Sequence, residues 1–377
     1  MKLLLFISAI AILASAAVWK SWPVDASWPV REDSFSVIKN QQAKFSKSFI
    51  FKQETVASVH ASAIVSVSGN KLLSVWYGGS REGSGDVAIY GSMKKTGSDW
   101  DNPSVIINRT KLADDTDRYI KKLGNPVLIS DGKSTVWMFF VSTSIGGWST
   151  STINLMVSQD AGQTWGVAKR LVTSPFLNLS TLVKGRPFFY QDGTIGLPAY
   201  HELAGKFAEL IRVSQDGDVL DKVRITHGRY TIQPSIAKLR DDRLITMMRN
   251  TNSIRNIVRA FAKQGGKKWS EPSYTELPNP NAAVSMAGNE NLLVLVYNDL
   301  KDDRNQLALA VSLDEGVNWR KRYQLESSAP DEAGIKSEFS YPYLIRASDG
   351  DFHLVYTWQR KRIAYVSFNR AWLEQLP

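Results

Sequence analysis

The stretch that decides the fold is Ser158-Gln159-Asp160-Ala161-Gly162-Gln163-Thr164-Trp165, which returns as Ser312-Leu313-Asp314-Glu315-Gly316-Val317-Asn318-Trp319. Ser, Asp, Gly and Trp occupy the same four offsets in both octets. In such a turn the Asp carboxylate accepts hydrogen bonds from backbone N–H groups, the Gly supplies a positive φ, and the Trp is a large apolar anchor. Two copies of one turn predict that a larger structural unit is repeated.

Short apolar or β-branched strands that end in a small residue precede both octets and recur along the chain. The sequence predicts them at Val87–Ser92, Asn154–Ser158, Glu209–Ser214, Asn256–Ala262, Gln306–Ser312 and Ile363–Ser367. Their last residues lie 66, 56, 48, 50 and 55 positions apart. A four-stranded propeller blade takes roughly 40 to 50 residues, so these intervals indicate six blades.

A hairpin, formed by two strands and a polar turn, precedes each of these strands. The six hairpins are predicted at Ala61–Tyr77, Pro126–Val141, Pro187–Tyr200, Pro234–Met248, Ala282–Tyr297 and Pro342–Thr357. This order of strands and turns is that of a propeller blade. The sequence therefore predicts an all-β fold, a six-bladed β-propeller over residues 48–377, and no linker divides it.

The N-terminus has the pattern of a signal peptide over residues 1–17. Met1-Lys2 is followed by an apolar run from Leu3 to Val18, with small residues at Ala14-Ser15-Ala16. We expect the protein to be secreted or periplasmic. An uncleaved N-terminal anchor is the alternative, although the run is shorter than the ~20 residues that span a bilayer comfortably. Residues 18–47 are expected to form an extended lead-in segment, in part a closing strand.

Composition restricts the possible partners. The chain has no cysteine, which excludes disulfides, a thiolate nucleophile and a Cys-ligated zinc. A net charge of +10 favours anionic partners in general. The basic groups Arg118–Lys122 and Arg320–Arg322 are expected in solvated turns, and no interleaved basic and aromatic motif indicates nucleic-acid binding. We expect a monomer with no cofactor, no metal and no stable membrane insertion.

Propeller geometry predicts where a site lies. The innermost strand of each blade starts, and the second strand ends, on one face, so residues at those points surround the mouth of the central channel. The strand starts are His60, Asn125, Arg186, Gln233, Asn281 and Tyr341. The second strands and the loops after them bring Glu82, Asp86, His201, Glu202, Arg249, Trp358 and Arg360. Such a mixture of arginine, carboxylate, amide and aromatic groups suits a glycan that carries negative charge.

Together these features resemble the sialidase (neuraminidase) superfamily, and bacterial predicted-neuraminidase proteins with BNR repeats in particular. The octets resemble that family's Asp-boxes, and the phrases Leu277–Asn281, Glu338–Pro342 and Tyr356–Arg360 resemble its sequence. The resemblance covers nearly the whole mature chain. It implies an exported exo-α-sialidase type of glycoside hydrolase that releases a terminal acidic sugar, although an Asp-box indicates the fold better than the chemistry.

The resemblance also implies catalytic roles. Tyr341 matches the position of the family's nucleophile, which replaces the usual glycosidase carboxylate. Glu338 or Glu202 would take the proton of this tyrosine. Asp86 or Glu82 would protonate the leaving group.

Arg249 and Arg304 resemble two of the three arginines that hold the substrate carboxylate in the family. The chain departs from the pattern at two places: His60-Ala61-Ser62 stands where the family has Arg-Ile-Pro, and Gln233 stands where it has Glu. An amide cannot act as the base for Tyr341. Two alternatives therefore stay open, a hydrolase or lyase that acts on another acidic or deoxy-sugar polysaccharide and a propeller that binds glycan without catalysis.

Overall fold

The computed structural model of the chain describes residues 27–32, 41–54, 56–175, 177–228, 230–330, 334 and 336–376. The predicted signal peptide and much of the predicted lead-in segment lie outside these residues. Within the described ranges, no helix combines the length and the apolar character needed to cross a membrane.

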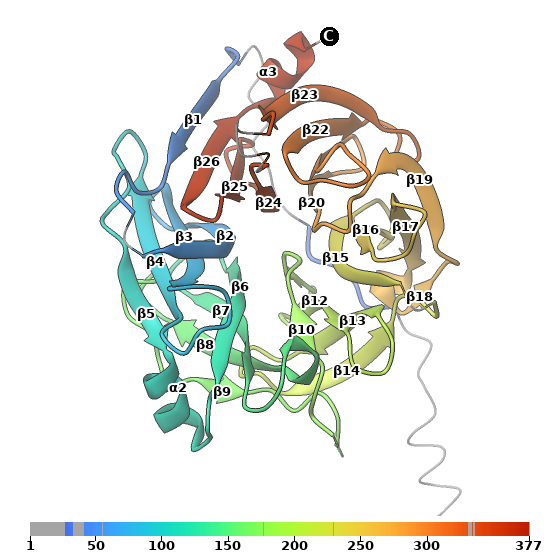
Figure 1. The fold of residues 1–377 in the computed structure, drawn as a ribbon. Coiled ribbons are helices and arrows are strands. Elements are labelled where there is room, and N and C mark those ends of the chain that lie inside the picture. The colour runs from blue at the N-terminus through green and yellow to red at the C-terminus, as the bar shows by residue number, and fades with distance from the viewer. Residues whose placement is uncertain are drawn as a thin grey trace, which may run out of the picture.

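Six antiparallel sheets surround a central channel, so the predicted six-bladed propeller is confirmed (Figure 1). Blade one contains β2 (Ser58–Val67), β3 (Lys71–Gly79), β4 (Ala88–Lys95) and β5 (Ser104–Asn108). Blade two contains β6 (Lys122–Ser130), β7 (Val136–Thr143), β8 (Thr152–Ser158) and β9 (Lys169–Arg170). In blade three, β10 (Leu182–Val183) and β11 (Phe188–Phe189) both pair with β12 (Ile195–His201), which is followed by β13 (Phe207–Val213) and β14 (Val219–Arg224).

The other three blades complete the ring. Blade four contains β15 (Thr231–Lys238), β16 (Leu244–Asn250) and β17 (Asn256–Lys263), with β18 (Lys268–Trp269) and β19 (Ser273–Pro278) outside β17. Blade five contains β20 (Ser285–Asn289), β21 (Leu292–Tyr297), β22 (Gln306–Ser312) and β23 (Arg320–Ser327). Blade six contains β24 (Phe339–Arg346), β25 (Phe352–Trp358), β26 (Arg362–Phe368) and β1 (Phe45–Phe49).

The N-terminal strand β1 closes the ring. It pairs with β26 of the last blade, from Phe45 opposite Phe368 to Phe49 opposite Ala364. The C-terminal helix α3 (Arg370–Gln375) covers this seam, because Trp372 stacks on Phe45 with ring centroids 4.5 Å apart. The boundary predicted at residue 48 therefore falls inside the closing strand. Among the described residues, the connections also contain the α-helix α2 (Arg109–Thr116) and two short 3-10 helices, η1 (Trp148–Thr150) and η2 (Gln264–Gly266).

The burial of each strand explains its pattern of apolar and polar residues. Every residue of β7, which lies between two neighbouring blades, is buried, and its sequence is apolar almost throughout. The outer strand β14 instead alternates between half-buried and exposed residues. A strand with packing on both faces needs an apolar run, whereas an outer strand needs only one apolar face.

The repeated octets form two turns of the same geometry. After β22, Ser312 Oγ donates to Asp314 Oδ1 at 2.7 Å, and the N–H groups of Gly316 and Asn318 donate to Ser312 Oγ and Asp314 Oδ1 at 2.9 and 3.0 Å. The corresponding distances in the turn after β8 are 2.7, 2.8 and 2.8 Å. The two aspartates are thus structural, and each fixes the end of a third strand.

Each of these turns also packs against the preceding blade. The φ angle of Gly316 is +81°, and a Cβ atom at this residue would lie 2.2 Å from Ile245 Cδ1 on β16. The φ angle of Gly162 is +92°, and a Cβ atom there would lie 2.5 Å from Leu73 Cδ2 on β3. The two glycines therefore serve both the turn and the contact between blades.

Replacing Gly316, and comparing it with a glycine that makes no contact between blades, separates the contribution of the turn from that of the contact. Gly316→Ala is expected to lower the free energy of unfolding by about 3 kcal/mol, because it combines an unfavourable positive φ with overpacking. Gly97→Ala is the matched control: Gly97 has a φ of +80° and no atom within 4 Å of the added Cβ, so only about 1 kcal/mol is expected. Urea unfolding of both variants measures the difference, and equal losses would contradict the contact between blades.

Candidate functional site

The inner strands contain a repeated β-bulge close to the mouth of the channel. The pairing register shifts in β2, β6, β15 and β24, and the residues Ala61, Asn125, Gln233 and Tyr341 in these bulges have positive φ angles of 49°, 46°, 53° and 55°. Asn281 has the same conformation, with a φ of 56°, shortly before β20. Bulges re-aim side chains, and left-handed non-glycine residues cost energy, so their recurrence here indicates a functional constraint. In blade one this position is Ala61, one residue after the predicted His60.

The hydroxyl group of Tyr341 receives two hydrogen bonds. Gln233 Nε2 donates to it at 3.2 Å and Arg249 Nη1 donates at 3.4 Å. Arg249 is fixed in turn, because Nη1 donates to Gln233 Oε1 at 3.1 Å and Nε donates to Asn281 Oδ1 at 2.7 Å. Two donors, one of them cationic, therefore point at the phenol oxygen and stabilise negative charge on it.

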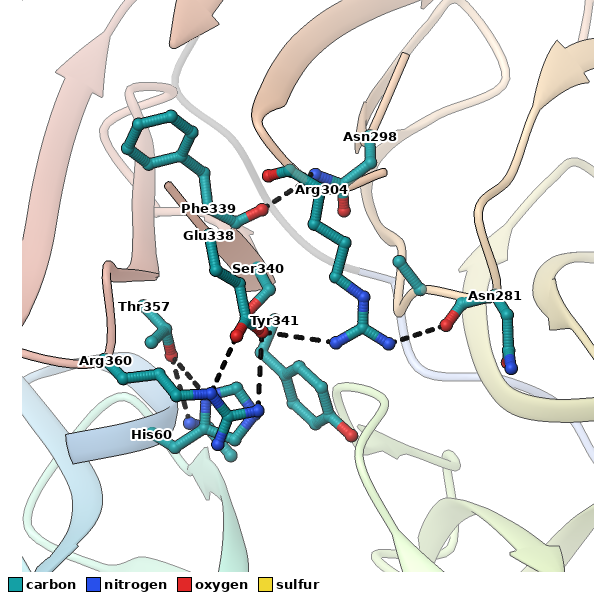
Figure 2. A network of polar contacts seen from close by, with 12 residues as sticks. His60, Asn281, Asn298, Arg304, Glu338, Phe339, Ser340, Tyr341, Thr357 and Arg360 are labelled. Atoms are coloured by element: carbon teal, nitrogen blue, oxygen red, sulfur yellow. Dashed lines mark hydrogen bonds and ion pairs between the residues drawn. The ribbon is translucent and has the colours of Figure 1, made fainter. Parts of the chain in front are cut away.

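Glu338 lies between two arginines (Figure 2). Arg304 Nη1 lies 3.2 Å from Glu338 Oε1, Arg360 Nε lies 2.7 Å from Oε2, and Ser340 Oγ donates to Oε1 at 2.6 Å. Burial opposes ionisation of Glu338, but the hydrogen bonds from Arg360 and Ser340 outweigh it and lower its pKa to about 2. The Glu338 carboxylate is thus charged at neutral pH and paired with both arginines. Arg304 Nη2 also donates to the backbone carbonyl of Asn281 at 2.7 Å.

Arg360 connects blade six to the first loop of blade one. It stands in the tight turn between β25 and β26, and its Nη1 lies 2.7 Å from Glu82 Oε2. Trp148 Nε1 donates to the other oxygen of Glu82 at 3.2 Å. Burial raises the pKa of Glu82, but the hydrogen bonds from Arg360 and Trp148 and the charge of Arg360 lower it, so the net shift is downward. The mouth of the channel therefore holds three guanidinium groups, those of Arg249, Arg304 and Arg360.

His60 is buried beside the tyrosine. Its ring centroid lies 4.2 Å from that of Tyr341, and its Nδ1 is hydrogen-bonded to Thr357 Oγ1 at 3.0 Å. Burial and then the charge of Arg360 lower the pKa of His60 to about 3, so this histidine is neutral. The guanidinium group of Arg360 reaches the neighbourhood of His60 from blade six.

Lys184 is a site residue that the repeat did not predict. It lies between β10 and β11 and is 3% exposed. Its Nζ donates to the carbonyl oxygen of Pro342 at 3.1 Å and lies 5.6 Å from the ring centroid of Tyr341 and 5.0 Å from that of Tyr343. Burial lowers the pKa of Lys184 to about 7. The only sequence feature that could have indicated Lys184 is its position two residues before the predicted strand start at Arg186.

The structure places three predicted residues away from this network. Arg186 lines a pocket of about 450 Å³ at the opposite end of the channel, because the inner strand of blade three is broken and Lys184 takes the position near Tyr341. Trp358 packs against Phe49 with ring centroids 5.3 Å apart. Its neighbour on β25, Thr357, faces His60, and because side chains alternate along a strand, Trp358 lies on the opposite face of the sheet. His201 stacks on Phe207 at 4.7 Å, and its Nε2 accepts a hydrogen bond from the Ala204 N–H.

Three more predicted residues lie around the same mouth. Asn125 Nδ2 donates to Tyr200 Oη at 3.3 Å, and Gln233 Nε2 donates to the same oxygen at 3.3 Å. Burial, followed by the charges of Tyr341 and Glu202, raises the pKa of Tyr200. Glu202 directly follows the last residue of β12. The Glu202 carboxylate makes no hydrogen bond or ion pair with any residue that the structure describes.

Asp86 ends the exposed loop that contains Glu82. Its Oδ2 accepts a hydrogen bond from the Ser80 N–H at 2.8 Å, and its Oδ1 accepts one from Ser80 Oγ at 3.0 Å. These hydrogen bonds lower the pKa of Asp86. In the described part of the chain, no three His, Asp or Glu side chains are grouped as ligands for a metal ion.

Comparison with known proteins identifies similar folds. A family model described as a BNR repeat-like domain matches residues 70–354. A search of curated protein sequences finds no match. Among solved structures, the Hadza microbial sialidase Hz136 is 18% identical with a TM-score of 0.66, over 83% of this chain and 66% of the sialidase; this chain thus spans slightly less than two thirds of that protein.

Two further sialidase structures resemble the chain to the same degree. The NanB sialidase of Streptococcus pneumoniae is 11% identical with a TM-score of 0.67, over 86% of this chain and 70% of the sialidase. The intramolecular trans-sialidase of Ruminococcus gnavus, solved with oseltamivir carboxylate, is 14% identical with a TM-score of 0.66, over 86% of this chain and 97% of that protein. At such identities the similarity shows a shared fold, the sialidase-like propeller that the sequence predicted.

The buried Lys184 makes stability depend on pH. Its pKa is about 7 in the folded protein and roughly 10.4 in an unfolded chain, so the unfolded state binds more protons between these values and stability rises with pH. Relative to Lys184→Met, the wild-type free energy of unfolding should increase by about 2 kcal/mol from pH 7 to 9. Urea unfolding at both pH values measures this, and a pH-independent difference between the two proteins would contradict the buried charge.

Proposed function

The chain belongs to the family of proteins with a BNR repeat-like domain, and from this premise we propose that it is a sialidase-like glycoside hydrolase that releases a terminal acidic sugar. The observation that carries the proposal is the position of Tyr341, whose hydroxyl receives hydrogen bonds from Gln233 and Arg249 at the mouth of the channel. A tyrosine nucleophile is an established variant among glycosidases. Its neutral phenol approaches an anomeric centre beside a carboxylate without the repulsion that an aspartate would feel.

The charge balance of the site supports an anionic sugar. Arg249, Arg304 and Arg360 contribute three positive charges, and the paired Glu82 and Glu338 contribute two negative ones. Among the described residues, Arg249 contacts only the neutral side chains of Gln233, Asn281 and Tyr341, so its positive charge is available to a substrate carboxylate. Because Asn281 binds both Arg249 and Arg304, these two guanidinium groups are fixed side by side and suit a carboxylate that accepts from both.

In the proposed reaction the Tyr341 oxygen attacks the anomeric carbon and its proton passes to Glu202. Glu202 suits this role better than Glu338, since Glu338 is held by arginines at a pKa of about 2. The bond to the leaving oxygen breaks as Asp86 donates a proton to that oxygen. Water then cleaves the glycosyl-tyrosine bond with overall retention. Asp86 takes the proton of the attacking water, and Glu202 returns its proton to the departing Tyr341 oxygen.

We choose Asp86 as the acid because its side chain is less restrained than that of Glu82. Glu82 is held by Arg360 and by Trp148, whereas Asp86 is bound only to Ser80 of its own exposed loop. A substrate can therefore draw Asp86 toward the leaving group at a lower cost than Glu82. The lowered pKa of Asp86 implies that only a small fraction of it is protonated at neutral pH.

A second candidate function is supported by Gln233. An amide, not a carboxylate, contacts the Tyr341 hydroxyl, and an amide accepts no proton at neutral pH. This favours a propeller that binds an acidic glycan without turnover, or an enzyme that acts on a different acidic sugar. A glycan panel scored for both binding and product release distinguishes these functions.

Removal of the nucleophile tests the proposed hydrolysis. Tyr341→Phe should lower kcat for a methylumbelliferyl α-sialoside by about 1000-fold or more, because no covalent intermediate can form. Tyr274→Phe, on outer strand β19 with 48% exposure, is the matched control and should retain wild-type activity. Wild-type protein that binds sialosides but releases no sugar would refute the hydrolase and support the binding propeller.

The proposed acid predicts an acidic pH dependence. As pH falls from 7 to 5, the protonated fraction of Asp86 grows and kcat/KM for a glycan substrate should rise. His60 and Glu338, with pKa values of about 3 and about 2, keep their charge states over this range.

The leaving group identifies which carboxylate is the acid. Asp86→Asn should lower kcat by about 100-fold with a glycan leaving group but much less with methylumbelliferone, which needs little protonation. Glu82→Gln is the control and should weaken substrate binding equally for both leaving groups. The reverse pattern would assign the acid to Glu82.

A further inference from the structure

A pocket of about 570 Å³ lies beside the Asp-box turn that follows β22, and it shares no residue with the site around Tyr341. It is bordered by that turn, by the start of β23 and by α3, which lies next to β23 at the rim of the propeller (Figure 1). Its apolar side chains are those of Leu292, Val311 and Leu373, with Leu313 at 70% exposure beside them. The pocket is therefore apolar in its depth and has the volume of a small-molecule site.

Two arginines on this pocket have no partner within the described part of the chain. Arg320 and Arg322 line it, and neither makes an ion pair or hydrogen bond with a described residue. The sequence predicted Arg320–Arg322 in a solvated turn, but these residues begin strand β23. Lys321, between them, instead pairs with Asp299 at 2.5 Å. Arg320 and Arg322 therefore have no counter-charge among the residues that the structure describes.

The acidic side chains that line the pocket are already engaged. Asp314 accepts hydrogen bonds from Ser312 Oγ and from both the backbone and the side chain of Asn318. Glu374 Oε1 accepts from Arg370 Nε at 2.7 Å. An anion from outside the protein can therefore pair with Arg320 and Arg322 without competition from the acidic side chains that line the pocket.

We propose that this pocket binds an amphiphilic carboxylate of fatty-acid chemistry. The acyl chain would pack on Leu292, Val311 and Leu373, where each buried methylene adds affinity. The carboxylate would accept hydrogen bonds from Arg320 and Arg322, whose planar guanidinium groups fit its two oxygens. The lining contains no aromatic side chain to cover a sugar ring, and the proposal does not depend on the proposed hydrolase activity.

Isothermal titration calorimetry of the full chain with dodecanoate, below its micelle concentration, tests the proposal. Wild-type protein should bind one dodecanoate, and Arg320→Met/Arg322→Met should weaken binding by about tenfold or more, because charge-assisted hydrogen bonds are lost. Lys321→Met is the control: it removes one positive charge from the same strand but away from the pocket, and it should leave affinity unchanged. Dodecanol, which lacks the carboxylate, should bind about tenfold more weakly than dodecanoate.

A second variant keeps the test decisive if the double arginine variant does not fold. Leu313→Glu changes an exposed residue at the pocket and should repel dodecanoate while the far-ultraviolet circular dichroism stays that of the wild type. No binding to folded wild-type protein would overturn the proposal. Equal loss in Lys321→Met, or dodecanol binding as tight as that of dodecanoate, would overturn the assignment to Arg320 and Arg322.

Discussion

The pairing of β1 with β26 is the constraint on which the rest of the structure depends. Five residues from one end of the chain, Phe45–Phe49, complete the sheet formed by its other end. Because this pairing joins both ends of the chain in one blade, the six blades are held in a closed ring around one axis. Only then do the bulges of the inner strands converge, so the geometry around Tyr341 is a consequence of closure.

At the mouth of the channel the dominant effect is electrostatic. Three arginines stand within a small polar network, and two carboxylates, Glu82 and Glu338, offset part of their charge. Burial keeps His60 neutral and lowers the pKa of Lys184 to about 7, which limits the positive charge beside Tyr341. The site is therefore preorganised for an anion beside Arg249, whose partners are neutral, and for negative charge on the tyrosine oxygen.

The fold could be predicted from the sequence to a large extent, because its strands follow local patterns. The predicted strand Gln306–Ser312 coincides with β22, and the two octets form the same turn. Features that depend on contacts between residues far apart in the sequence could not be predicted in the same way. The ion pair of Arg360 and Glu82 joins residues 278 positions apart. The inner strand of blade three is broken around Lys184, and the alternation of side chains along β25 directs Trp358 into the core. A sequence repeat alone predicts none of these three features.

The central claim is that Tyr341 forms a covalent bond with an acidic sugar, and trapping that intermediate tests it most directly. A difluorinated sialic acid, whose fluorine atoms slow breakdown of the glycosyl-enzyme, would be incubated with the protein and the peptides mapped by mass spectrometry. The account predicts one added sugar on the peptide that contains Tyr341 and none in Tyr341→Phe. A sugar attached to another residue, or complete absence of label on protein that binds the reagent, would contradict it.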